Sequence, residues 1–580
     1  MRTIAIIASL LITNLIFSQE NKSTLCLPMF NSNSFSFELD TLESSESDVS
    51  YLIDKNYQID LDETQFIDGK KSVGITGLNQ DSKTYATLSL TVPIKIKKNA
   101  HIVLSVWVKT DSLYGVNSIA MLRLMGHRDK DTGTFPLFKF GEKTLKGSED
   151  WTQITLAAVV KTDENFIVLS GLMQGKGKAW FDNFELKIDG EDIKNVSFFK
   201  DNNQLNTVTN TLSKYITKIE DNNLEQVSNF ISNQNSKVRI IGLGEATHGT
   251  SEIYSYKSDL IKTLIKNNNV TKIALEAYYT NTEDLNTYIL KGEGNLKKIL
   301  ANIGFWSYYT IEFKELVIWL KNYNKKTNNK IIIVGVDSQS GGNALKILTE
   351  RTKRNTHISK ILKELKKDST EISDKIRISN SILQELIKTN QDKNIIMNAR
   401  ELSQSYFVNQ YKGLKYTSVR DSLQAFNIGN VEKELASDEK MIYWAHDQHI
   451  RKKPNSAGGF LNEKYKDRYV NVGFLLENGK YSAVDKDTKK LDSDNDLKLV
   501  KCTSLENLMG KYNYPTILLN SKSALTDPYL KNNLFNKLLV KRSIGALETN
   551  YQFISLNNDP NTFFDLLIYI KDSNPSQLIK

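Results

Sequence analysis

Residues 238–252 read VRIIGLGEATHGTSE. A mainly apolar run ends here in glycines, an acid and a histidine, and the helix-like segment SEIYSYKSDLIKTLIK follows at once. This order predicts a buried strand that turns tightly into a helix, because glycine tolerates tight turns. Further apolar runs alternate with helical patterns: TKIALEA, KIIIVGVD, KMIYWAH and YVNVGFLL. Such alternation is typical of an α/β fold with a mainly parallel sheet covered by helices.

The α/β pattern predicts a domain over residues 205–575. No good strand pattern occurs from about 343 to 436, where segments such as ISKILKELKKD indicate a helical insertion. Late strands are expected at YPTILLN and FFDLLIYI.

Residues 27–190 show a different sequence pattern. Short β-rich segments such as ATLSLTVPIKI, HIVLSVWVKT, SIAMLRLMG and NFIVLSGLMQG lie between turn residues and predict an all-β, antiparallel sandwich. The region resembles the jelly-roll domains that accompany secreted carbohydrate-active enzymes, most specifically at its close, GKAWFDNFELKIDG. A structural accessory role and a glycan-binding role both remain open. Trp107 and Trp180 could stack on sugars, but core positions are the favoured interpretation.

The chain of 580 residues is long enough for two or three domains. Its formal net charge of +9 is mild, and no basic block is interleaved with aromatic residues, so we expect a solvated basic surface and no nucleic-acid partner. With only Cys26 and Cys502, a disulfide framework and a cysteine-rich metal site are excluded, whereas one bridge between these two remains possible.

Residues 1–19, MRTIAIIASLLITNLIFSQ, have a basic start and a short apolar run. This pattern predicts a signal peptide and an exported protein, periplasmic or extracellular. An uncleaved anchor is the alternative. No later run is long and apolar enough for a transmembrane span in the mature chain.

Ionisable side chains follow several of the predicted strands. In open α/β sheets, ligands bind beyond the carboxyl ends of the strands. The chain has six histidines, and three of them lie at these ends. We therefore predict one convergent site. Its members are Glu245, His248, Glu276, Asp337, His446, Asp447 and His449.

His248 would lie close to a helix N-terminus capped by Thr250 or Ser251, where the helix dipole favours a neutral imidazole. A neutral imidazole can take a proton from water, and Glu245 or Glu276 would orient the ring. Lys257 lies about two helical turns further on. It would neutralise a buried acid or bind a substrate oxygen; the alternative is a solvent-facing lysine.

The pair His446 and His449 could ligate a metal. However, it follows a strand, whereas the two histidines of an H-E-x-x-H site lie on a helix. We therefore expect neither a metal nor a cofactor, with a metal site and a purely structural His449 as alternatives. The absence of a G-x-S-x-G elbow disfavours a serine nucleophile.

The segments GLGEATHGTSE, IALEA, GVDSQS and WAHDQHIRK, in this order, resemble the erythromycin esterase family over roughly residues 205–575. RDSLQAFNI at 420–428 is similar to a degraded form of the family's Arg-Asp segment, with Arg420, Asp421 and Asn427 as counterparts. The resemblance implies metal-independent hydrolysis of a small-molecule ester, in the best-known members a macrolide lactone, by a histidine that activates water. The catalytic residues would be His248, Glu245, Glu276 and His446, and the substrate-binding residues His449, Lys257, Asp337 and Arg420.

Two positions depart from the family pattern. The family usually has arginine where this chain has Lys257, and asparagine where it has Asp447. Lysine lacks the planar, bidentate grip of arginine, and Asp447 adds negative charge. Both departures favour an ester other than a macrolide. The alternative function is a non-catalytic protein that holds haem or a glycan in the same cleft, with Tyr278 or Tyr279 as candidate haem ligands.

Overall fold

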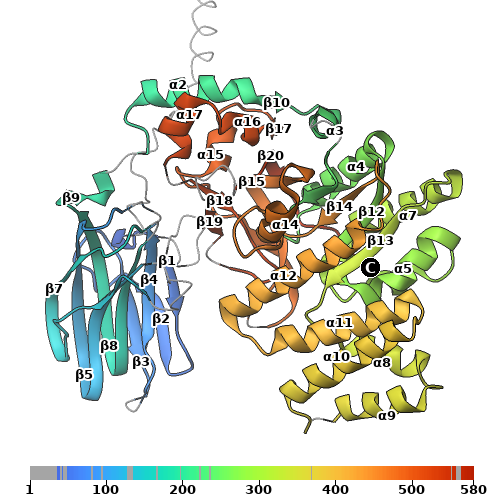
Figure 1. Cartoon of the computed structure of the whole chain (residues 1–580). Coiled ribbons are helices and arrows are strands. Elements are labelled where there is room, and N and C mark those ends of the chain that lie inside the picture. Colours follow the sequence, from blue (N-terminus) through green and yellow to red (C-terminus); the bar gives the residue numbers. More distant parts are fainter. Residues whose placement is uncertain are drawn as a thin grey trace, which may run out of the picture.

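The computed structural model describes residues 35–580, apart from 40–41, 43–48, 80–81, 93, 95, 127–134, 165–166, 196–197, 221–223, 234–236, 368, 487, 538, 550–551 and 557–562. The predicted signal peptide and Cys26 lie outside the described residues. The β-rich N-terminal part and the mixed α/β part that follows are both present, as predicted (Figure 1).

The described residues of the N-terminal part form nine strands, and every pairing between them is antiparallel. The longest two, β5 and β8, pair with each other along most of their lengths. The strands are β1 (Val49–Leu52), β2 (Tyr57–Asp62), β3 (Ser72–Gly77), β4 (Ala86–Val92), β5 (His101–Met125), β6 (Phe138–Phe140), β7 (Gly147–Val159), β8 (Ile167–Ile188) and β9 (Glu191–Asp192).

The expectation of uniformly short strands was wrong. HIVLSVWVKT and SIAMLRLM are two parts of β5, and IVLSGLMQG continues through AWFDNFELKI in β8. The register of the β5–β8 pair shifts between Asp111 and Ile119, opposite Gly175 and Gly177, whose φ angles are 91° and 129°. Glycines that look like strand ends in the sequence therefore lie in bulges within continuous strands.

The second sheet has the strand order β10-β17-β20-β15-β11-β14-β12-β13. From β20 to β13 all neighbours run parallel, and β17 is antiparallel to both β20 and β10. Its strands are β10 (Ile216–Lys218), β11 (Ile240–Leu243), β12 (Val270–Tyr278), β13 (Ile332–Asp337), β14 (Lys440–Trp444), β15 (Tyr469–Val484), β16 (Leu491–Asp496), which pairs only with β15, β17 (Thr516–Leu519) and β20 (Leu566–Ser573); β18 (Val540–Arg542) pairs with β19 (Phe553–Ser555).

Side chains alternate between the two faces of this sheet, as strand geometry requires. Ile241 and Leu243 belong to one apolar cluster, and Ile240 of the same strand belongs to another. Helices therefore cover both faces. They are α2 (Asn202–Leu212), α3 (Glu225–Asn233), α4 (Ser251–Asn268), α5 (Tyr279–Lys291), α6 (Leu296–Asn302), α7 (Ile311–Lys326), α13 (Asp447–Ile450), α14 (Ala457–Tyr465), α15 (Leu505–Gly510), α16 (Ser521–Ala524) and α17 (Pro528–Leu530).

Only helices lie between β13 and β14 in the described part of the chain. The first four of them form the layer at the lower right of Figure 1 and share an apolar cluster of their own, which includes Leu348, Leu362, Leu386 and Leu402. The last of them contributes Ala425, Ile428 and Val431 to the cluster that also holds Ile240 of the sheet. In chain order, these helices are α8 (Gly342–Arg351), α9 (Thr356–Leu365), α10 (Ile372–Lys388), α11 (Lys393–Asn409) and α12 (Gly413–Glu432).

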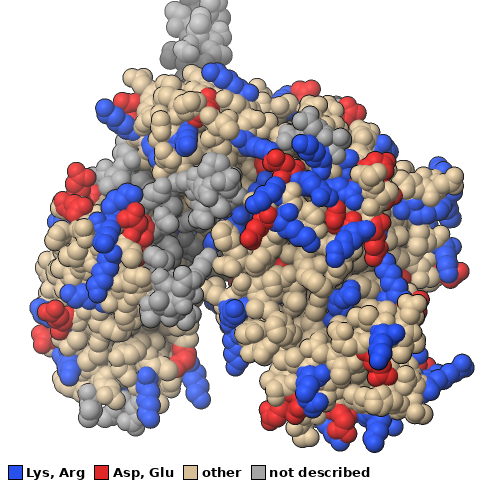
Figure 2. Space-filling view, in the orientation of Figure 1, with Lys and Arg blue, Asp and Glu red and all other residues tan. Residues whose placement is uncertain are grey.

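Basic and acidic side chains are interspersed on the face shown in Figure 2. Among the described residues, no helix has the length and apolarity needed to cross a membrane.

Candidate active site

The stretch between β11 and α4 folds into a strand-to-helix turn, as predicted. Thr250 occupies the N-cap position of α4, but its side chain does not cap the helix and instead contacts the hydroxyl of Thr247 at 3.0 Å. Gly244 is required by a close approach, since a Cβ atom there would collide with the carboxylate of Asp447. Its φ angle is not in the left-handed region, so this position needs glycine for the close approach to Asp447 and not for an unusual backbone angle.

Glu245 is the centre of a buried cluster behind this turn. Its Oε1 lies 2.6 Å from Nδ1 of His248, and its Oε2 accepts hydrogen bonds from Nζ of Lys257 at 2.7 Å and from Nε1 of Trp444 at 2.9 Å. Burial alone would raise the pKa of Glu245, but Lys257 and His248 lower it to about 2. Glu245 is therefore an anion at neutral pH.

Lys257 is fully buried, so the solvent-facing alternative was wrong. Its Nζ also lies 4.2 Å from the centroid of the Trp444 ring, a cation–π arrangement. Burial lowers the pKa of Lys257 to about 8, although Glu245 opposes this shift. The lysine thus neutralises a buried acid, one of the two roles predicted for it.

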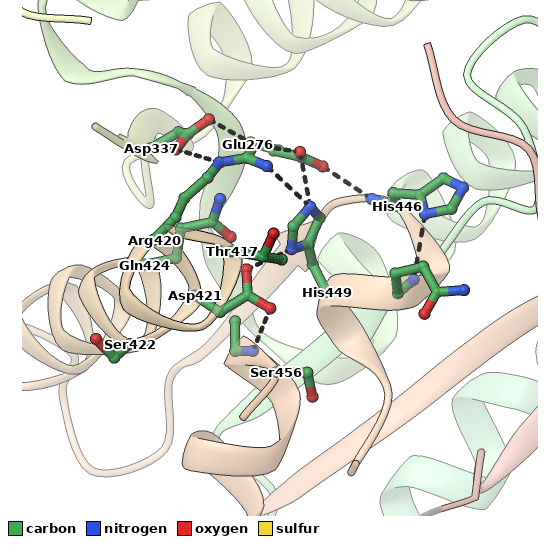
Figure 3. Close-up of polar contacts among 12 residues, drawn as sticks. Glu276, Asp337, Thr417, Arg420, Asp421, Ser422, Gln424, His446, His449 and Ser456 are labelled. Carbon is green, nitrogen blue, oxygen red and sulfur yellow. Dashed lines mark hydrogen bonds and ion pairs between the residues drawn. The ribbon is translucent and has the colours of Figure 1, made fainter. Parts of the chain in front are cut away.

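Glu276 is the centre of a second cluster (Figure 3). Its Oε1 accepts a hydrogen bond from Nη2 of Arg420 at 2.6 Å and lies 3.1 Å from Nε2 of His449. Its Oε2 accepts the backbone N–H of His446 at 3.0 Å. Burial opposes ionisation, but His449 and Arg420 hold the pKa of Glu276 well below its usual range. Glu276 lies inside β12, which continues as far as Tyr278.

Arg420 bridges Glu276 and Asp337. Its Nε and Nη2 donate to the two carboxylate oxygens of Asp337 at 3.0 and 2.7 Å. Although burial acts in the opposite direction, this pairing lowers the pKa of Asp337. The Arg-Asp segment on α12 therefore reaches the end of β13.

His449 lies between two carboxylates. Its Nδ1 is 2.6 Å from Oδ1 of Asp421, and its Nε2 faces Glu276. Burial would lower the pKa of His449, but Glu276 and Asp421 raise it to about 10. His449 is therefore a cation at neutral pH. It lies beside Arg420, a second cation, and shared carboxylates hold the two together.

His446 has the opposite character. Its Nε2 donates to the backbone carbonyl of Ile544 at 3.0 Å, and its Nδ1 accepts the N–H of Gln448 at 3.2 Å. Burial, supported by the charge of His248, lowers the pKa of His446 to about 3, so the ring is neutral. Its centroid lies 4.9 Å from that of His248, which links the two clusters.

His248 is the most accessible member of the Glu245 cluster. Its side chain is 16% exposed, against 2% for Glu245. Because Nδ1 faces Glu245, proton exchange with a substrate or a water molecule has to use Nε2. The carboxylate and the imidazole thus form the base-and-orienter pair that proton transfer requires.

All eight predicted catalytic and substrate-binding residues lie in these two linked clusters. Three contributors were missed: the indole of Trp444, the carbonyl of Ile544, and Lys541, which pairs with Asp447 at 2.5 Å. Trp444 precedes the late histidines, so the WAH tripeptide could have indicated it. Residues 541 and 544 come from a distant segment that carries no recognisable motif.

Other predicted residues lie further out. Asn427 bonds to the carbonyl of Val336 and to Gln404, and Tyr279 donates its hydroxyl to Asn394 on α11. The ring of Tyr278 packs against Phe305 at 5.0 Å. In the described ranges, no three His, Cys, Asp or Glu side chains are grouped to hold a metal ion.

The family model for erythromycin esterase matches residues 265–374 and 348–573, a range that contains Glu276, Asp337, Arg420 and both late histidines. The chain belongs to the erythromycin esterase family. Among curated members, it is 30% identical over 108 residues to erythromycin esterase type II of Escherichia coli, covering 18% of this chain and 25% of that protein. It is 23% identical over 288 residues to the type I enzyme of the same organism, covering 42% and 68%.

Two solved structures show that the fold of this erythromycin esterase family member is shared. A Bacillus cereus protein superposes with a TM-score of 0.56 at 23% identity, over 65% of this chain and 99% of its own. A succinoglycan biosynthesis protein gives a TM-score of 0.56 at 19% identity, over 66% and 100%.

Proposed function

We propose that the protein hydrolyses a carboxylic ester of a small molecule with water activated by His248. The observation that carries this proposal is the 2.6 Å contact between Nδ1 of His248 and the carboxylate of Glu245. The anionic carboxylate fixes Nδ1 as the protonated nitrogen. It leaves Nε2 with its lone pair toward the accessible side of the ring.

In the proposed reaction, Nε2 of His248 takes a proton from water while the water oxygen attacks the ester carbonyl carbon. Glu245 stabilises the resulting imidazolium, and Lys257 keeps Glu245 ionised and in place. The tetrahedral intermediate then expels the alcohol oxygen, which receives the proton from His248. The products are a carboxylic acid and an alcohol, and the base returns to its neutral state.

The Glu276 cluster supplies positive charge to the same site. His449 is cationic and Arg420 is held beside it, so these side chains are our candidates for binding the carbonyl oxygen as it gains negative charge. His446 is neutral and makes hydrogen bonds with both ring nitrogens. We propose that His446 restricts the position of the His248 ring. Its other candidate role is to shuttle a proton, after one of its two hydrogen bonds has broken.

The substrate class follows from Lys257 and Asp447. Because the resemblance to the family departs at these two positions, which support the catalytic clusters from behind, we propose an ester other than a macrolide lactone as the physiological substrate. A screen of chemically diverse esters, with macrolides included, tests this. Hydrolysis of one or more non-macrolide esters is the expected result, and EDTA should leave the rate unchanged. Exclusive macrolide turnover would contradict the substrate proposal.

The same screen tests hydrolysis itself. If no ester is cleaved and the purified protein shows a Soret band, the non-catalytic haem-binding alternative replaces this proposal. If no ester is cleaved and immobilised glycans retain the protein through this cleft, the glycan-binding alternative replaces the hydrolase proposal.

We also propose that the protein is exported, with cleavage close to residue 19, and that its N-terminal β domain holds a glycan. Mass spectrometry of the mature protein from its native host tests cleavage, and an intact residue 2 would contradict it. A glycan array with the full-length protein tests the second proposal.

A further inference from the structure

Arg451 lies two residues beyond His449 and directly follows α13. Only 8% of its surface is exposed. Nevertheless, within the described residues its guanidinium makes no hydrogen bond and no ion pair. A guanidinium has five N–H donors and stays charged, so a buried one is normally paired.

Two other arginines with little exposed surface show the usual situation. Arg542 donates to the carbonyls of Leu476, Glu477 and Lys498 and to the side chain of Gln552. Arg420 is held by Glu276 and Asp337. Both are held by several hydrogen bonds or ion pairs, whereas Arg451 forms neither with the described residues.

The acids that act on Arg451 electrostatically, Asp447 and Asp421, lie beyond ion-pair distance and already have partners. Asp447 pairs with Lys541 at 2.5 Å, and Asp421 pairs with His449 at 2.6 Å (Figure 3). Lys452, the next base along the chain, is neutralised by Asp565 at 2.7 Å. Of the basic side chains Arg451, Lys452 and Lys541, Arg451 is therefore the one that no ion pair of the described residues neutralises.

The guanidinium is also reachable. Its nitrogen atoms lack a partner among the described residues but are not fully enclosed, so they keep some solvent-accessible surface. Burial lowers the pKa of Arg451 to about 10, which leaves the group charged at neutral pH. A partly desolvated, charged fork is well suited to a carboxylate or phosphate, whose oxygens accept paired N–H bonds.

We propose that Arg451 binds an oxyanion, a carboxylate or a phosphate, that the ester substrate carries in addition to its scissile bond. The proposal rests on the hydrolysis proposed above and narrows the substrate class to anionic esters. One charged hydrogen-bonded contact corresponds to a discrimination of about ten- to a hundredfold.

The kinetic test compares aryl esters that share a leaving group: a neutral acetate and a hemisuccinate with a free carboxylate. The readout is the ratio of their kcat/KM values. Arg451→Gln should lower the hemisuccinate-to-acetate ratio at least about tenfold, and Arg451→Lys should retain part of it. Arg354→Gln, the same change at an exposed arginine, should leave the ratio as in the wild type. An unchanged ratio in Arg451→Gln would overturn the proposal.

A second measurement does not depend on turnover. Calorimetric titration of the full-length protein with inorganic phosphate and, separately, with glutarate should detect binding of one or both, and the stronger ligand identifies the oxyanion. Binding should persist in His248→Asn and be lost in Arg451→Gln. If the wild type binds neither, Arg451 is not an anion site. If anions bind but no ester is cleaved, the hydrolase proposal fails and the site remains.

The thermal melt separates this role from a structural one. Because Arg451 has no partner in the described protein, Arg451→Met should keep or raise the melting temperature. A marked decrease would show that the guanidinium stabilises the fold, which would contradict the proposal.

Discussion

His248 and His446 lie with their ring centroids 4.9 Å apart, yet only one of them is arranged as a base. Nδ1 of His248 faces an anionic carboxylate, whereas Nε2 of His446 donates to the carbonyl of Ile544. A carboxylate stabilises an imidazolium, but a carbonyl acceptor combined with an N–H donor fixes the neutral tautomer. The two histidines, close in space, are therefore expected to differ in function.

Trp444→Phe tests how strictly Glu245 must be oriented. The variant keeps an aromatic ring beneath Lys257 but loses the N–H that donates to Glu245 at 2.9 Å. We expect kcat to decrease about tenfold, since a hydrogen bond to a charged group contributes about 1.5–3 kcal/mol, while KM changes little. Trp319→Phe on α7 is the control. Wild-type kcat in Trp444→Phe would show that the indole only fills space.

Lys257→Arg tests the charge beside Glu245. With its pKa at about 8, Lys257 is a cation below that pH and loses its proton above it. The kcat of the wild type should therefore decline above about pH 8, because Glu245 then loses its partner. Arginine stays charged, so the decline should move upward by about one pH unit or more.

Lys262→Arg, further along the same helix, is the matched control and should keep the wild-type profile. Identical alkaline profiles for the wild type and Lys257→Arg would contradict the role assigned to Lys257.

His449→Gln tests the cationic state of His449 through stability. In the folded protein its pKa is about 10, against 6.5 for the free side chain. The pairing of cationic His449 with Glu276 and Asp421 stabilises the fold fully below pH 6.5. This stabilisation is lost as the pH rises to about 10, by about 1.4 kcal/mol of unfolding free energy for each pH unit. The difference in melting temperature between wild type and variant should therefore shrink over this range.

His357→Gln, at an exposed histidine on α9, is the comparison and should show no such trend. A difference between wild type and His449→Gln that stays constant from pH 6.5 to 10 would mean that His449 is not held as a cation.

Residues at strand ends could be predicted because topology alone brings the carboxyl ends of parallel strands to one edge. Glu276, Asp337 and His446 come from three neighbouring strands or the residues just after them. The position of Lys257 could be predicted, because helical spacing places it on the face of the helix that points toward the turn. Its burial could not, since a single lysine on a helix is more often solvated.

Other features leave no trace in sequence patterns. The acceptor for His446 is a backbone carbonyl, and any residue type at position 544 would supply one. Glycines 175 and 177 looked like turn residues because a bulge and a turn both require unusual backbone angles. The unpaired state of Arg451 depends on which acids are already neutralised, and only the three-dimensional arrangement shows that.

The kcat of His248→Asn, on an ester that the wild type cleaves, tests the central proposal most directly. A general base contributes roughly a hundred- to ten-thousandfold, so kcat should decrease by at least about two orders of magnitude, with the melting temperature nearly unchanged. A folded His248→Asn protein with near-wild-type kcat would contradict the account, and the base would then have to be sought at His446 or His449.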